Sequence, residues 1–232
     1  MFLPFHTMVL IFAVSAMLGW IYEMIAVSIH KKRIAPRGLL VGPFLPIYGF
    51  GALVIITATH NVTDSPLAVF LVGMAVATAF EYLSAWLLEK IFKMSWWSYD
   101  EFKINYKGII ALAPSLVWGF ASLLAIYVLW PLLQDLDGQL FERFGVVPYI
   151  VFTVCIVADM IFSAVHVAKF RAYSTQVRKS WEKDGELDTA KYMRYLYREI
   201  RSRTPLFSIR NFVMKTAPER LKDAWPGHKK KQ

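Results

Sequence analysis

The sequence has a single cysteine, few charged residues, and none of the short motifs that mark common enzyme classes. Cys155 lies in an apolar run, so no intramolecular disulfide can form and no cysteine-based zinc site is indicated. The chain contains no phosphate-binding loop, no nucleophile elbow and no metal-ligand spacing. No cofactor is therefore predicted, and the absence of an ATPase or hydrolase motif favours a protein that is not itself an enzyme.

What is abundant is apolar surface, and the few charges are unevenly spread. Of the 232 residues, 56% are hydrophobic and only 19% charged, which is too apolar for an ordinary soluble domain. Residues 1–168 carry a net charge of −1, whereas residues 169–232 carry +10. The sequence therefore predicts two domains: a transmembrane domain, residues 1–168, and a basic amphipathic helical tail in the cytoplasm, residues 169–232.

Five apolar stretches reach the length of about 20 residues that a helix needs to cross a bilayer. They are Phe5–Ile29, Leu39–Thr59, Leu67–Phe92, Ile109–Leu133 and Pro148–Ala168. Backbone polar groups in lipid must pair within their own segment, so helices rather than strands are expected. The first stretch lacks the basic start of a secretory signal and is interpreted as a retained span. The predicted fold is an all-α, polytopic membrane bundle of about five transmembrane helices.

The loops between these stretches predict the orientation. Basic residues follow the first and third stretches and fill the tail, whereas residues 61–65 contain no lysine or arginine and residues 134–147 contain only Arg143 beside three acids. The positive-inside rule places basic loops in the cytoplasm. We therefore expect the N-terminus outside and the tail inside a cell membrane.

The second stretch is interrupted by glycine and proline in its cytoplasmic half, notably at Gly42, Pro43 and Pro46. Proline removes a backbone donor and clashes with the preceding turn. Two interpretations are open: a tolerated kink, or a broken, re-entrant segment, which survives at membrane depth only where protein or a cavity surrounds it. Pro114 predicts a kink on the same side.

The tail carries a helical stripe that continues from the fifth stretch. Phe170, Tyr173, Val177 and Trp181 have helical spacing and predict a helix that stops near Gly185. Basic amphipathic helices beside a span usually lie on the anionic inner leaflet, so membrane lipids are the favoured partner, with a protein-docking surface as the alternative. No nucleic-acid partner is predicted.

Ionisable residues within the apolar stretches gather in the cytoplasmic leaflet. Each costs about 2.5–3.5 kcal/mol on insertion scales, so each requires an explanation. Counting from the outer helix ends puts Asp159 near the midplane and the others progressively closer to the cytoplasm: Glu81, Glu23, His166 and Glu89, with Arg37 entering from that face. Aromatic residues rim them, including Trp96, Trp97 and Tyr99. Such a set would suit a cationic or amphipathic ligand.

For most of these residues, a purely structural role is an alternative to ligand binding. Glu23 and Arg37 could form an ion pair across the first loop, Glu89 could be solvated, and the tryptophans could be an ordinary aromatic belt. Ser115 has no histidine placed beside it as a nucleophile needs, and its hydroxyl is expected to bond back to the kinked helix. Glu81 and Asp159 are harder to explain in this way because neither is close enough to a helix end to snorkel.

A long string of motifs resembles a known family. It comprises Trp20-Ile-Tyr-Glu23, Arg37-Gly38, Gly42-Pro43, Pro46, Tyr48-Gly49, Gly51, Glu81, Trp86, Glu89, Trp96-Trp97-Ser-Tyr99, Asn105, Gly108, Ser115 and Trp118-Gly119. Over about residues 5–130 this string is similar to the CmpB-type ABC-transporter permeases of bacteria. The resemblance implies nine ligand-facing candidates: Glu23, Arg37, Tyr48, Glu81, Glu89, Trp97, Asn105, Ser115 and Trp118. Family members have Asp-Tyr after the paired tryptophans, where this chain has Ser98-Tyr99, so Asp100 would have to substitute for that acid.

These observations favour a membrane transport component with a polar substrate site in the cytoplasmic half of the bundle. With no ATPase motif of its own, an ABC-type mechanism implies a separate nucleotide-binding subunit. Five spans are few for a complete pathway, which favours a homodimer or larger assembly. The alternatives are a membrane enzyme or carrier acting on lipid head groups at the inner leaflet, and a non-transporting regulator whose tail docks a partner.

Overall fold

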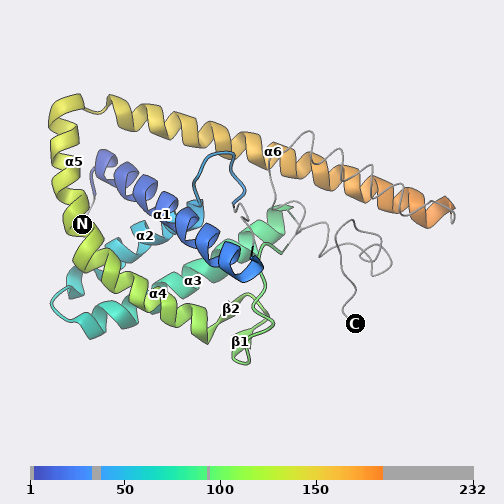
Figure 1. The fold of residues 1–232 in the computed structure, drawn as a ribbon, viewed down its shortest axis with the longest axis horizontal. Helices are drawn as coiled ribbons and strands as arrows, with labels where there is room; N and C mark the ends of the chain where they lie inside the picture. Colours follow the sequence, from blue (N-terminus) through green and yellow to red (C-terminus); the bar gives the residue numbers. More distant parts are fainter. Residues whose placement is uncertain (1–2, 33–37, 93–94, 185–232) are drawn as a thin grey trace. The chain divides into compact units, whose positions relative to one another are not determined.

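The computed structural model describes residues 3–32, 38–92 and 95–184, and these are almost entirely helical (Figure 1). The elements in chain order are α1 (Phe5–Lys31), α2 (Pro46–Thr59), the short turn η1 (His60–Val62), α3 (Pro66–Phe92), β1 (Asn105–Tyr106), β2 (Ile110–Ala111), α4 (Leu112–Leu124), the π-helical turn η2 (Ala125–Leu129), α5 (Trp130–Phe144) and α6 (Val147–Asp184). The predicted all-α membrane fold is confirmed.

Four helices in the described ranges are long and apolar enough to cross a membrane: Phe5–Ile29, Pro66–Phe92, Leu112–Phe144 and Val147–Val165. Large apolar side chains on them face outward, such as Leu67, Phe120 and Val154, each more than 60% exposed. A water-soluble protein rarely exposes so much continuous apolar surface, whereas a lipid-facing helix must. The chain is a multi-pass membrane protein.

The second predicted span, Leu39–Thr59, is helical only from Pro46 onward, which corrects the expected length. At about 1.5 Å per residue the 14 residues of α2 measure about 21 Å, short of a hydrocarbon core of about 30 Å. Pro46 stands in the first turn of α2, where its missing N–H costs nothing. Of the two interpretations left open, the structure selects a broken segment over a kinked helix.

Asp159 satisfies part of the backbone that this break leaves unpaired. Its Oδ1 accepts a hydrogen bond from the backbone N–H of Val41 (3.0 Å), and its Oδ2 accepts one from Gly42 (2.8 Å). The hydroxyl of Ser163, one turn further along α6, also donates to Oδ1 (3.0 Å). Unpaired N–H groups in lipid are costly. The carboxylate that the sequence places near the midplane therefore supports non-helical backbone.

The fourth predicted span, Ile109–Leu133, starts later and extends further than expected. Ile110 and Ala111 belong to a strand, and the helical run Leu112–Phe144 continues through most of the expected outer loop at residues 134–147. Pro131 lies at the start of α5, and its ring would clash with the carbonyl of Tyr127 in a regular helix. The π-helical turn η2 removes that clash, and α5 turns away from α4 there (Figure 1).

The chain divides into two compact units, Met1–Tyr22 with Pro43–Ala158, and Glu23–Gly42 with Asp159–Gln232. The core of the first unit is built from α1, α2, α3, η2 and α5, and its buried members are Ile11, Ala52, Ile56, Val69, Ile126 and Leu133. α3 and α4 pack so closely at Gly73 that a side chain there would collide with Ser122. Small residues at such crossings let backbones approach, as is typical of membrane helices.

The helix expected to continue from the fifth span ends at Asp184, next to the predicted stop at Gly185. α6 passes residue 168 without a break. The division into domains 1–168 and 169–232 stays a prediction. The orientation derived from the basic loops also stays a prediction. The rest of the tail, residues 185–232, lies outside the described residues.

Candidate functional site

The loop between α3 and α4 contains a small β-hairpin. Asn105 pairs with Ala111 and Tyr106 with Ile110. Ile109 donates to the carbonyl of Tyr106 (3.0 Å), closing a turn whose central residues, Lys107 and Gly108, have φ of 55° and 66°. Positive φ at both positions is what a type I′ turn requires.

Further hydrogen bonds fix the segment before β1 onto this hairpin. The backbone N–H of Tyr99 donates to the carbonyl of Gly108 (2.8 Å), and the indole Nε1 of Trp97 donates to the carbonyl of Ile109 (3.0 Å). The side chain of Asn105 donates to Phe102 (2.7 Å) and accepts from Gly108 (2.9 Å). These bonds hold residues 97–111 as one cap, so the position of Tyr99 is determined.

Glu81 lies beneath this cap and is only 3% exposed. The hydroxyl of Tyr99 donates to its Oε1 (2.8 Å), and the indole Nε1 of Trp118 on α4 donates to its Oε2 (3.3 Å). The ring of Trp118 in turn lies 5.5 Å, centroid to centroid, from that of Tyr48 on α2. One carboxylate is thus enclosed by α2, α3, α4 and the cap.

No ion pair joins Glu81 to a lysine or arginine among the residues that the structure describes. A carboxylate at membrane depth is costly unless its charge is balanced. Two neutral donors satisfy one acceptor site on each oxygen but supply no positive charge. Within the described residues, the charge of an ionised Glu81 is therefore not balanced by a cation.

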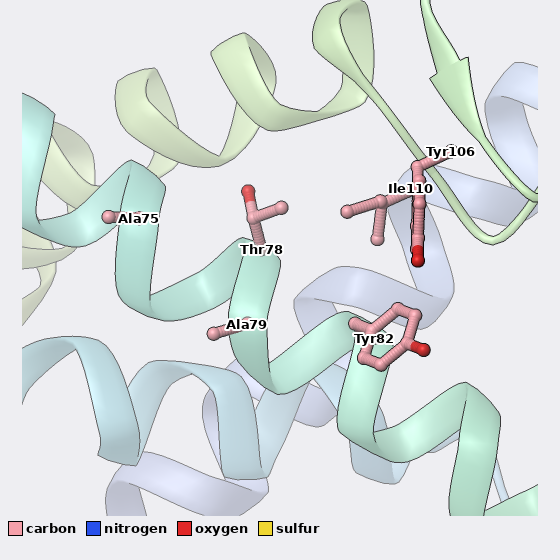
Figure 2. Close-up of a pocket in the computed structure, with 6 residues that line it drawn as sticks. All are labelled: Ala75, Thr78, Ala79, Tyr82, Tyr106 and Ile110. Atoms are coloured by element: carbon pink, nitrogen blue, oxygen red, sulfur yellow. The ribbon is translucent and has the colours of Figure 1, made fainter.

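A second feature lies where α3 meets the hairpin. An open groove of about 510 Å³ is lined by Ala75, Thr78, Ala79, Tyr82, Tyr106 and Ile110. Figure 2 shows Thr78 and Ile110 facing each other across it, with the rings of Tyr82 and Tyr106 together at one end. Those two rings are 6.1 Å apart between centroids. None of the lining residues is one of those that hold Glu81.

The structure brings only some of the nine candidates together. Glu81, Trp118 and Tyr48 form one cluster. Trp97 and Asn105 shape the cap through backbone contacts and do not reach Glu81 themselves. The buried hydroxyl of Ser115 donates to the carbonyl of Ala111 (2.9 Å), the local helical bond expected for it.

Of the remaining acidic and basic candidates, only Glu89 can be compared with this cluster. Glu89 is exposed, and eight residues of helix put it about 12 Å along the axis from Glu81 and about 80° around it. Its neighbour Lys90 lies over the ring of Trp86, 4.8 Å from the centroid. Glu23 belongs to the second unit, and Arg37 and the side chain of His166 lie outside the described residues.

A polar cluster that sequence reasoning missed lies at the predicted outer end of the first unit. Asp137, 4% exposed, accepts hydrogen bonds from Thr7 Oγ1 (2.6 Å) and Tyr149 OH (2.8 Å), and His6 Nδ1 lies 2.8 Å from its Oδ2. The ring of His6 also stacks on Phe141, 4.1 Å between centroids. His6 and Asp137 are 131 positions apart in the sequence, so no local pattern pointed to this cluster.

Tyr99 is the other residue whose role was not predicted, although its loop was singled out. A tyrosine that follows paired tryptophans gave no sign that its hydroxyl would reach Glu81, 18 residues earlier. Within the described ranges, no group of three or more histidine, cysteine or acidic residues could hold a metal ion.

Comparison with known families identifies the family of this chain. The model of the family described as "Putative ABC-transporter type IV" (ABC_trans_CmpB) matches residues 10–164, two thirds of the chain and all the elements that build this site. Neither the curated proteins nor the solved structures give a match.

Proposed function

The chain belongs to the CmpB family of type IV ABC transporters, and from this premise we propose that it is a permease subunit whose substrate site surrounds Glu81. Its role in membrane transport follows from the family and from its spanning helices. The observation that carries the finer proposal is a buried carboxylate with two neutral donors and no described cation. Glu81 lies about 22 Å along α3 from its outer end, which is the cytoplasmic half on the predicted orientation.

The substrate class that fits is a small organic cation. A cation close to Glu81 would compensate the buried charge, and the faces of Tyr48 and Trp118 would contact its apolar groups. Tyr99 occupies Oε1 in the observed state, so substrate entry requires the cap to shift. The hairpin thus acts as a gate on the cytoplasmic side, while the broken start of α2 supplies the flexible joint beside Tyr48.

Choline and its neutral isostere 3,3-dimethylbutanol test this substrate class in a matched way, because they differ in charge and hardly in shape. Choline is expected to raise the melting temperature of the purified protein in detergent, since only the folded state binds it. The isostere is expected to leave it unchanged. Equal shifts of the melting temperature with choline and its isostere would contradict a cation site. The absence of a shift with each of three organic cations, choline, spermidine and tetraphenylphosphonium, would also contradict it.

The energy source is proposed to be a separate ATPase subunit, because the chain has no phosphate-binding loop. Two or more copies of this chain complete the pathway. Affinity purification of the native protein in mild detergent, followed by mass spectrometry, is expected to recover a P-loop ATPase. Recovery of the protein alone, with turnover of a phospholipid in the absence of nucleotide, would instead favour lipid head-group chemistry at the inner leaflet.

A further inference from the structure

We propose that the groove between α3 and the hairpin binds one anionic phospholipid of the inner leaflet. The proposal does not depend on the cation site, because none of the six lining residues contributes to holding Glu81. Its volume of about 510 Å³ lies within the range of about 300–1,000 Å³ that is usual for small-molecule sites.

The groove has the depth that a lipid from the inner leaflet requires. Counted at about 1.5 Å per residue from Pro66, Ala75 lies about 14 Å and Tyr82 about 24 Å from the outer end of α3. In a hydrocarbon core of about 30 Å, and on the orientation that the basic loops predict, these levels are the midplane and a point about 6 Å short of the inner boundary. The groove therefore runs along the inner leaflet, with its tyrosine end toward the head groups.

Most of the lining is apolar. Ala75, Ala79 and Ile110 contribute small or apolar side chains, as an acyl chain needs. The rings of Tyr82 and Tyr106 stand together at one end of the groove (Figure 2), the end closer to the membrane interface, which tyrosines favour.

A positive charge stands at the same end. The Nζ of Lys107 lies 5.2 Å from the centroid of the Tyr106 ring, and the type I′ turn fixes the backbone of this lysine. Lysines near the inner leaflet attract anionic lipids. The charge of Lys107 therefore selects an anionic phospholipid over a neutral one as the occupant.

The test is native mass spectrometry of the full-length protein in mild detergent with equal amounts of phosphatidylglycerol and phosphatidylcholine of identical acyl chains. Phosphatidylglycerol is expected to be retained at least about fivefold more than phosphatidylcholine. Lys107→Gln is expected to remove most of that preference. Lys103→Gln, which removes the same charge from the same hairpin outside the groove, is expected to keep it.

Filling the groove tests the apolar part separately. Ala79→Phe is expected to reduce retention of both lipids, whereas Ala158→Phe, at an exposed position of α6, is expected to leave it unchanged. Equal retention of both lipids by the unmodified protein would overturn the proposal. A dimer that Ala79→Phe converts to monomer would also overturn it, because the groove would then seat a second copy of the chain.

Discussion

Replacing Glu81 with glutamine is expected to abolish the choline-dependent rise in melting temperature. The amide has no negative charge, so a cation entering the site would be desolvated without a partner. Removing one member of a buried charge pair costs about 2–5 kcal/mol, which lowers affinity at least about thirtyfold. The amide also retains only one acceptor oxygen for the two donors, Tyr99 and Trp118.

Two matched variants separate this effect from general damage. Glu89→Gln removes an exposed carboxylate of the same helix and is expected to leave choline binding within about twofold. Tyr99→Phe removes the hydroxyl that occupies Oε1 and is expected to strengthen binding about two- to tenfold, because the ligand no longer displaces a hydrogen bond. Choline binding by Glu81→Gln at the affinity of the unmodified protein would remove this carboxylate from the mechanism.

Replacing Asp137 with alanine is expected to destabilise the protein by about 2–6 kcal/mol, because the buried hydroxyls of Thr7 and Tyr149 lose their acceptor at about 1–3 kcal/mol each. His6, 23% exposed, can turn to water in part and adds less. The change appears as a lower melting temperature in detergent. It also loosens the contact between the start of α1, α5 and the start of α6.

Asp135→Ala is the control for this change, because Asp135 is an exposed carboxylate on the same helix. A surface substitution of this kind is expected to alter stability by less than about 0.5 kcal/mol. Tyr149→Phe removes a single donor and is expected to cost about 1 kcal/mol. If Asp137→Ala and Asp135→Ala have the same melting temperature, the hydrogen bonds that Asp137 accepts contribute nothing to stability.

Local sequence patterns were enough to predict the helices that cross the membrane. Apolar length is a property of one segment, and lipid leaves the backbone no other way to pair, so α1, α3 and α6 fall close to their predicted ranges. The pattern failed at α2, where Gly42, Pro43 and Pro46 allowed either a kink or a break. A hydrogen-bond acceptor 117 positions away, Asp159, supports the break.

In the candidate site, too, one residue could be selected from the sequence and others only from the structure. A carboxylate at membrane depth requires an explanation wherever it stands, so Glu81 could be selected from the sequence alone. Glu89 lies eight residues further along the same helix, yet it is exposed whereas Glu81 is buried. Tyr99 could be placed only by the hairpin, where the carbonyl of Gly108 accepts a hydrogen bond from its backbone N–H while its hydroxyl donates to Glu81.

The sequence by itself determined that this chain is a helical, multi-pass membrane protein of an ABC-transporter family, because hydrophobic length and motif order are read along one dimension. The tertiary structure decided which polar groups meet. The enclosure of Glu81, the Asp137 cluster and the groove beside Tyr106 each join segments far apart in the chain. The physical reason is that a buried polar group in low-dielectric surroundings needs a hydrogen-bond partner. Which partner lies within reach is determined by how the helices pack.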